Sequence, residues 1–251
     1  MSDERAARLA AIRAANTARA PKAVSSAPVD PQPPVLAPQA LAVLLLGAAG
    51  GALLAAAALP ALLPGLTASL LGAEPSAYWL LARSSAMVAY ALLWLAMLSG
   101  LLMSNRLARV WPGGPTAFAL HQHTSLLGLA FSLFHALILL GDRFVAATLA
   151  QILVPFAYSG YAPLWVGLGQ VALYGLVLVG LSFYVRSHLG QRLWRLVHLL
   201  SFVVFALALA HGVMSGSDSV TRPAQVLYWS SGGSVLFLTV YRVLMAARGH
   251  S

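Results

Sequence analysis

Apolar residues dominate this chain in runs of about twenty residues or more, separated by short segments that hold most of the charges and prolines. A helix of that length matches the hydrocarbon thickness of a lipid bilayer. The runs predict six transmembrane helices, at residues 40–63, 77–103, 115–140, 164–185, 192–214 and 224–246. We therefore expect an all-α fold, a polytopic membrane protein built as a six-transmembrane-helix bundle.

The composition supports the same class. Of the 251 residues, 60% are hydrophobic and 8% are charged, and the mean hydropathy is +0.81. Soluble domains carry about 25% charged residues, so an ordinary soluble enzyme is excluded. The net charge of +9 raises the question of nucleic-acid binding. Because the basic residues lie at the ends of the apolar runs, the lipid bilayer is the expected partner and nucleic acid is not.

The basic residues also orient the predicted bundle. Twelve of the 15 Lys and Arg residues fall on one side: Arg5, Arg8, Arg13, Arg19, Lys22, Arg106, Arg109, Arg186, Arg192, Arg195, Arg242 and Arg248. Arg143 and Arg222 fall on the other side, and Arg83 lies within the second run. The positive-inside rule predicts a multi-pass protein of the cell (inner or plasma) membrane with both termini cytoplasmic. An even number of spans independently places the two termini on one side.

Two further segments of the sequence are expected to lie outside the membrane-spanning helices. Residues 1–38 predict a short cationic surface helix followed by a Pro-rich linker, ahead of a transmembrane domain at 39–251. The connection at 141–163 is moderately apolar, and we expect it to lie on the outer membrane surface.

Small residues are placed where helices could approach closely. Gly47 and Gly51 form a small-xxx-small pair, and four glycines thin the fourth run, namely Gly167, Gly169, Gly175 and Gly180. Helix–helix packing is the expected use of these positions. The alternative is that the fourth helix gives up side chains to admit a flat ligand.

Four histidines lie inside predicted spans, His121 and His135 in the third and His198 and His211 in the fifth. An ionisable residue at membrane depth indicates a functional site. The third and fifth helices cross in the same direction, so His121 and His198 share a depth near the cytoplasmic end. His135 and His211 share a depth near the outer end. Two histidine pairs at two depths are typical of two axially ligated haems.

Helix geometry tests this arrangement. The interval from His121 to His135 advances about 21 Å and returns to within about 40° of the same face, so one face could ligate two cofactors. The interval from His198 to His211 is one residue shorter and ends about 140° away. We therefore expect a π-bulge or kink in the fifth helix, for example near Ser201, or ligation from opposite flanks. The chain has no cysteine, so thiolate ligands are excluded.

These residues resemble the ferric-reductase-like transmembrane domain family, which includes ferric reductases, NADPH oxidases and the haem-binding membrane subunit of methionine sulfoxide repair. The resemblance covers roughly 77–246. Its motifs are His121-Gln122-His123 through His135-Ala136, and Trp194-Arg195-Leu196-Val197-His198 through His211-Gly212.

The resemblance implies two bis-histidine haem b groups, one held by His121 and His198 and the other by His135 and His211. It also implies a role for Arg83, because the family carries an arginine in the second span. Arg83 is expected to bind a propionate of the outer haem, the alternative being an arginine that reaches for the outer interface.

The other histidines are expected to play lesser parts. His123 lies about 120° from the face of His135, which favours an interhelical hydrogen bond over ligation. His188 and His250 fall in or beside cytoplasmic segments, where ordinary solvated histidines are expected.

The function that follows is transmembrane electron transfer, as the membrane component of an oxidoreductase. No Gly-rich phosphate-binding turn follows a strand in this sequence, so we expect a separate donor, whether a flavoprotein, a quinol or a bound flavin. The outer-side acceptor, and membership of a larger membrane complex, stay open. Two alternatives remain, a proton-coupled transporter and a haem-free structural membrane subunit. No Asp or Glu lies clearly within a predicted span, which disfavours the transporter.

Overall fold

The computed structural model describes residues 33–62, 77–142 and 145–248, and its described elements are all helical. The long helices are α2 (Pro38–Leu62), α4 (Ala77–Ser104), α5 (Gly114–Ile138), α7 (Pro163–Ser182), α8 (Arg186–Ser215) and α9 (Arg222–Arg248). Short elements between them are η1 (Leu107–Arg109), η2 (Leu139–Gly141) and α6 (Leu149–Leu153). All six long helices are long and apolar enough to cross a membrane, which confirms the predicted class. The predicted cationic N-terminal helix lies outside the described residues.

Proline and glycine residues mark the starts of several helices. Pro115 and Pro163 lie in the first turns of α5 and α7, where a missing N–H costs nothing. Gly113, which precedes α5, has a φ of 98°, a conformation that favours glycine. In α8 the first turn is set off by Gly190, at φ 75° and ψ 156°, and the helix then continues through both histidines.

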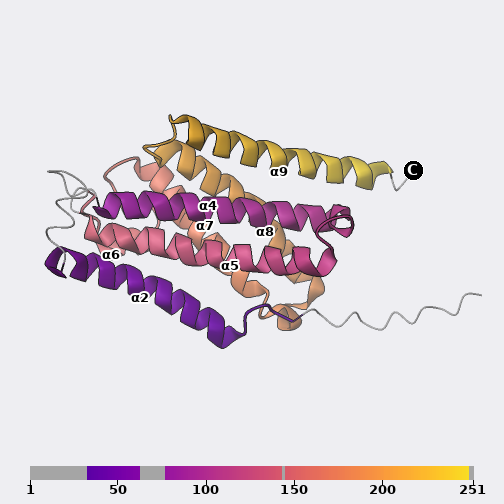
Figure 1. Ribbon diagram of the computed structural model, residues 1–251, viewed down its shortest axis with the longest axis horizontal. Coiled ribbons are helices and arrows are strands. Elements are labelled where there is room, and N and C mark those ends of the chain that lie inside the picture. Colours follow the sequence, from indigo (N-terminus) through magenta and orange to yellow (C-terminus); the bar gives the residue numbers. More distant parts are fainter. Residues whose placement is uncertain (1–32, 63–76, 143–144, 249–251) are drawn as a thin grey trace, which may run out of the picture. The chain divides into compact units, whose positions relative to one another are not determined.

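The bundle is built from two closely packed helix pairs. α4 packs along α5, and α7 packs along α8. α2 covers α5 from one side and α9 covers α4 from another (Figure 1). By contrast, α5 and α8 make few close backbone contacts in the described part of the chain. The two histidine-bearing helices therefore face each other across a space that side chains fill.

Apolar side chains lie both in the interior of the bundle and on its outer faces, as expected for a protein in a bilayer. The interior between the helix pairs contains an apolar cluster around Tyr90, Leu129, Leu176, Val204 and Phe205. Large apolar residues are exposed on the outside, for example Leu46 on α2 and Phe237 on α9. Because this chain exposes apolar residues on its outer helices, lipid is the natural solvent of those faces.

The close packing expected at glycine residues is found on α7 and is absent at the described glycine pair on α2. On α7, a Cβ at Gly175 would lie 2.6 Å from Val204 of α8, so close helix packing is confirmed there. On α2, a Cβ at Gly47 or Gly51 would meet no atom of the described chain within 4 Å. The expected packing at the α2 pair is therefore wrong for the described residues, since that face of α2 has no helix against it.

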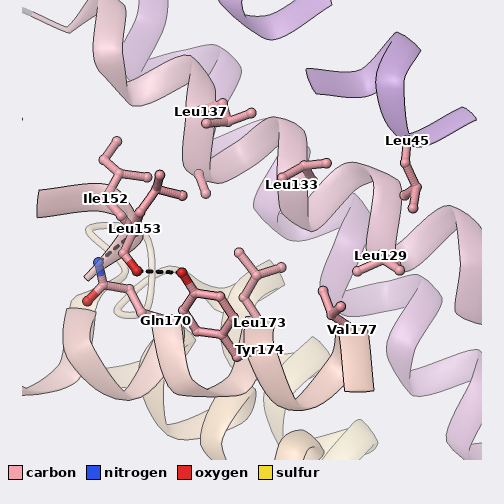
Figure 2. Close-up of a pocket in the computed structure, with 11 residues that line it drawn as sticks. Leu45, Leu129, Leu133, Leu137, Ile152, Leu153, Gln170, Leu173, Tyr174 and Val177 are labelled. Atoms are coloured by element: carbon pink, nitrogen blue, oxygen red, sulfur yellow. Dashed lines mark hydrogen bonds between the residues drawn. The ribbon is translucent and has the colours of Figure 1, made fainter. Parts of the chain in front are cut away.

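The connection at 141–163 is anchored to α7. The Gln170 side-chain amide donates to the carbonyls of Gln151 and Ile152, at 2.7 and 2.8 Å, and the Tyr174 hydroxyl donates to that of Leu153. An apolar cavity of about 120 Å³ lies beneath this connection, between α2, α5, α6 and α7 (Figure 2). The polar groups of Gln170 and Tyr174 are thus engaged by the connection, and none of the four histidines lines the cavity.

Hydroxyl groups join α9 to α4. The Tyr90 and Ser231 hydroxyls are 2.6 Å apart, and the Trp94 indole N–H donates to Ser234 at 2.9 Å. Ser231 is fully buried. These bonds add to apolar packing, because α9 also places Tyr228, Val235 and Leu238 in the buried cluster around Tyr90.

Ser231→Ala should lower the free energy of unfolding by about 1 kcal/mol, because the Tyr90 hydroxyl loses its partner in a low-dielectric interior. Thermal unfolding in detergent measures the change. Ser230→Ala is the matched control, because that exposed hydroxyl bonds only carbonyls of its own helix, at Val226 and Leu227. Its expected change is within about 0.5 kcal/mol. Equal effects of the two substitutions would show that the interhelical bond contributes nothing.

Candidate functional site

The four intramembrane histidines meet as two pairs between α5 and α8. The ring centres of His121 and His198 are 6.0 Å apart, and those of His135 and His211 are 6.2 Å apart. The pairing is the one that the depths of the histidines predict. Their role as ligands stays a prediction, because a distance alone does not identify what lies between two rings.

The expected distortion of the fifth helix is absent. Between His198 and His211 the backbone of α8 is regular α-helix, and Gly190, well before both, is its one non-helical residue. A bulge or kink near Ser201 was therefore a wrong expectation. In a regular helix the two side chains leave from flanks about 140° apart, which is the second arrangement considered. The space between α5 and α8 lets each ring reach its partner from a different flank.

Main-chain carbonyls hold three of the four rings. Nδ1 of His121 lies 2.8 Å from the Ala96 carbonyl, Nδ1 of His135 lies 2.8 Å from that of Ala82, and Nδ1 of His211 lies 2.9 Å from that of Trp165. A carbonyl only accepts hydrogen bonds, so each Nδ1 carries the proton and donates. Nε2 then keeps its lone pair, which is the form of histidine that binds a metal.

The two carbonyls on α4 belong to a short repeat. Ala82 and Ala96 are fourteen residues apart, the same interval as His121 and His135 on the antiparallel α5. Each alanine is followed three residues later by a buried serine, Ser85 or Ser99, whose hydroxyl donates to the same carbonyl at 3.0 Å. Sequence reasoning missed this Ala-x-x-Ser repeat. Its fourteen-residue spacing, equal to that of the histidines, was a usable signal.

Two glycines let two of the histidine rings lie close to the backbone of a neighbouring helix. A Cβ at Gly169 of α7 would lie 2.5 Å from Nδ1 of His211, and a Cβ at Gly100 of α4 would lie 3.3 Å from the His121 ring. Gly169 thus leaves the room in which His211 reaches the Trp165 carbonyl. This is close packing of a side chain on a helix, and the admission of a flat ligand by α7 stays a prediction.

His198 differs from the other three. In the described part of the chain its ring has no hydrogen-bond partner, and it stacks on Trp194, with ring centres 5.3 Å apart and planes 26° apart. The Trp194 indole N–H is itself buried without a partner among those residues. Packing, in place of a hydrogen bond, orients this ring.

Arg83 lies near the start of α4 and binds a carboxylate of the chain itself. Its Nε donates to Asp218 Oδ2 at 2.7 Å, and its Nη2 pairs with Oδ1. Asp218 lies in the turn between α8 and α9 and was not singled out from the sequence. The expected contact of Arg83 with a propionate stays a prediction.

Among the described histidines outside the two pairs, His188 agrees with its expected role and His123 does not. His123 is exposed and its Nδ1 donates to the carbonyl of Ala119 in its own helix, so the expected interhelical bond is wrong. His188 is exposed beside Ser187. His250 lies outside the described residues.

Gln122 follows His121 and was missed as an anchor. Only 7% of this residue is exposed, and its Oε1 accepts from the Val35 N–H at 2.6 Å. The Tyr184 hydroxyl donates to the Leu36 carbonyl at 3.1 Å. The last residues of the expected linker are therefore held against the end of the bundle where His121 and His198 lie.

Gly169→Ala should destabilise the protein by about 1 to 3 kcal/mol, because the new Cβ displaces the His211 ring from the Trp165 carbonyl. Gly180→Ala on the same helix is the control. Its Cβ would meet Leu129 at an ordinary 3.8 Å, and alanine favours a helix over glycine by up to about 1 kcal/mol. The two substitutions should change the unfolding midpoint in opposite directions. A gain in stability from Gly169→Ala would contradict the close approach.

Comparison with known proteins identifies the family of this chain. The family model described as "Domain of unknown function (DUF8596)" matches residues 77–218, which is more than half of the chain. The matched segment runs from α4 to the turn after α8 and contains all four paired histidines, Arg83 and Asp218. No curated protein and no solved structure matches the chain. The chain belongs to the DUF8596 family.

Proposed function

We propose that this protein holds two b-type haems, one between His121 and His198 and one between His135 and His211, and transfers electrons across the membrane. It acts as the membrane component of an oxidoreductase and receives electrons from a separate donor. The sequence motifs resemble the ferric-reductase-like transmembrane domain, which supports this class of function.

The spacing of the histidine pairs carries the proposal. Two metal–imidazole bonds of about 2.0 Å, with about 1 Å from each nitrogen to its ring centre, put two rings that share one metal roughly 6 Å apart. The ring centres are 6.0 and 6.2 Å apart. The planes are 69° and 64° apart, an arrangement that aromatic rings also adopt in edge-to-face contact, so the spacing supports the proposal together with the donor set and the hydrogen bonds to Nδ1.

The donor set supports a haem over other metal groups. Among the described residues no three His, Asp or Glu side chains gather into a group that could hold a metal ion alone. His121 with His198, and His135 with His211, would each hold a haem iron from both sides through two neutral imidazoles. A haem held in this way would supply one-electron transfer and would not bind oxygen or substrate at its iron.

The hydrogen bonds to Nδ1 support the same assignment. The carbonyls of Ala82, Ala96 and Trp165 fix the ring tautomer and orientation of His135, His121 and His211. A ligand histidine held in this way keeps Nε2 unprotonated and is more basic. Both helix pairs supply such carbonyls, so the fold itself orients three of the four rings.

Orientation and partners complete the proposal. The fourteen-residue interval on α5 separates the two pairs by about 21 Å, so one lies near each membrane face. The distribution of Lys and Arg puts His121 and His198 on the cytoplasmic side of the cell (inner or plasma) membrane, with both termini cytoplasmic. A flavoprotein, a quinol or a bound flavin would therefore deliver electrons at the cytoplasmic pair, and an acceptor would take them at the outer pair.

The purified protein should contain about two haems per chain, with the sharp reduced bands of a low-spin bis-histidine b-type centre. A dithionite-reduced minus oxidised optical spectrum, with haem quantified per chain, measures both. A stable six-helix protein that neither contains nor takes up haem would refute the proposal and favour a proton-coupled transporter or a structural subunit.

Single substitutions should separate the two centres. His121→Ala or His198→Ala should each remove one haem, and His135→Ala or His211→Ala the other, because a haem with one ligand lost is no longer held from both sides. Haem per chain should fall about two-fold in each case. His123→Ala is the control, since that ring is exposed and bonded to its own helix. Unchanged haem content in all four variants would overturn the ligand assignment.

A further inference from the structure

The spacing of the outer histidine pair depends on ties that lie outside the pair. α4 packs along α5 and α7 along α8, while α5 and α8 make few close backbone contacts. The two pairs also meet along α5–α7 and α4–α8, with far fewer backbone contacts than within each pair. His135 belongs to the first helix pair and His211 to the second, so a contact that joins α4 to the end of α8 helps to set the distance between them.

Arg83 supplies the α4 side of such a contact. It directly follows Ala82, whose carbonyl accepts the Nδ1–H of His135 at 2.8 Å. Two of its guanidinium nitrogens meet the two oxygens of Asp218, the two-point geometry in which arginine and carboxylate fix each other's orientation. The position of the His135 acceptor is thereby linked to that of Asp218.

Asp218 supplies the α8 side. The chain reaches it through the end of α8, where the Gly216 N–H donates to the Gly212 carbonyl at 3.0 Å. Its own main-chain carbonyl accepts from the Thr221 N–H at 2.8 Å and from the Thr221 hydroxyl at 2.7 Å, at the start of α9. The carboxylate is therefore held in a fixed place relative to His211, seven residues earlier.

We propose that Arg83 and Asp218 form a positioning pair that holds α4 against the end of α8 and so sets the spacing between His135 and His211. This inference rests on the proposed function for its consequence, since the spacing matters for the outer haem. Both residues act through the histidines and neither needs to touch the haem.

At the inner histidine pair the described hydrogen bonds run to a different helix. At that end α4 is joined to α9, where Arg242 Nη1 donates to the Ser104 carbonyl at 2.6 Å and the Asn105 amide donates to that of Leu238 at 3.1 Å. Neither bond reaches α8. Loss of the positioning pair should therefore affect the outer centre and spare the inner one.

Haem affinity tests the consequence. Each centre is isolated by substitution of the other, with His121→Ala leaving the outer pair and His135→Ala the inner pair. Arg83→Gln, Asp218→Asn and the exchanged pair Arg83→Asp with Asp218→Arg are made in both backgrounds. Arg242→Gln is the matched control. Haem-free protein in detergent is titrated with haemin, and the absorbance of the complex and its reduced spectrum are recorded.

In the outer-only background, Arg83→Gln and Asp218→Asn should each weaken haem binding about 10-fold to 100-fold, and the exchanged pair should recover most of that loss. The inner-only background and Arg242→Gln should keep the parent affinity. A loss with Arg83→Gln but not with Asp218→Asn would overturn the proposal and assign Arg83 to the haem propionate. No loss with either would also overturn it.

A second measurement needs no haem. Because the natural chain contains no cysteine, Leu80→Cys on α4 and Met214→Cys on α8 introduce two unique labelling sites at exposed positions. Nitroxide labels there report the distance between the outer ends of the two helices by electron double resonance. Arg83→Gln and Asp218→Asn should broaden the distance distribution, and the exchanged pair should narrow it again.

The haem titration and the label distances test the proposed function and the positioning pair separately. A parent protein that takes up no haem would refute the proposed function, and the label distances would still decide the positioning pair. Unchanged distance distributions in both single variants would overturn the positioning pair, whatever the haem content.

Discussion

The hydrogen bond from imidazole Nδ1 to a main-chain carbonyl of a neighbouring helix is the interaction on which the rest of this structure depends. A histidine in an apolar bundle that leaves a ring N–H without an acceptor loses hydration that nothing replaces. Three of the four rings avoid this cost by bonding a main-chain carbonyl, whereas His198 stacks on Trp194. The carbonyls of Ala82, Ala96 and Trp165 are those acceptors. A ring reaches a carbonyl inside a helix more easily where the residue one turn later is small, as Gly100 is after Ala96 and Gly169 after Trp165.

This requirement shapes the packing of the bundle. α4 must lie close along α5 to offer two carbonyls at the interval of the two α5 histidines, and α7 must lie close along α8 to accept from His211. The space between these helix pairs is then left to the four rings and to apolar side chains. Two closely packed helix pairs facing each other across oriented imidazoles form an apolar setting of the kind that the proposed electron transfer requires.

Much of this was accessible from the sequence. The spans were predicted to within about three residues at every helix end except the start of α8, predicted at 192 and found at Arg186, because the length of an apolar run is a local property that a bilayer selects directly. The pairing of His121 with His198 and of His135 with His211 followed from the parity of the helices and the depth of each residue. The acceptors were not predicted as individual residues, because a backbone carbonyl has no sequence signature of its own. The Ala-x-x-Ser repeat was the nearest available sign.

The sequence by itself determined the helices, their order and the depth of each histidine, since these depend on hydrophobic length and on charge at the helix ends. Only the tertiary structure decided how the rings meet. It showed a regular α8 whose histidines leave from opposite flanks, an arrangement that depends on the space between α5 and α8 and on no feature of α8 alone. It also brought Arg83 to Asp218, 135 residues later in the chain. Contacts between distant segments follow from how helices pack, and packing is a property of the whole bundle.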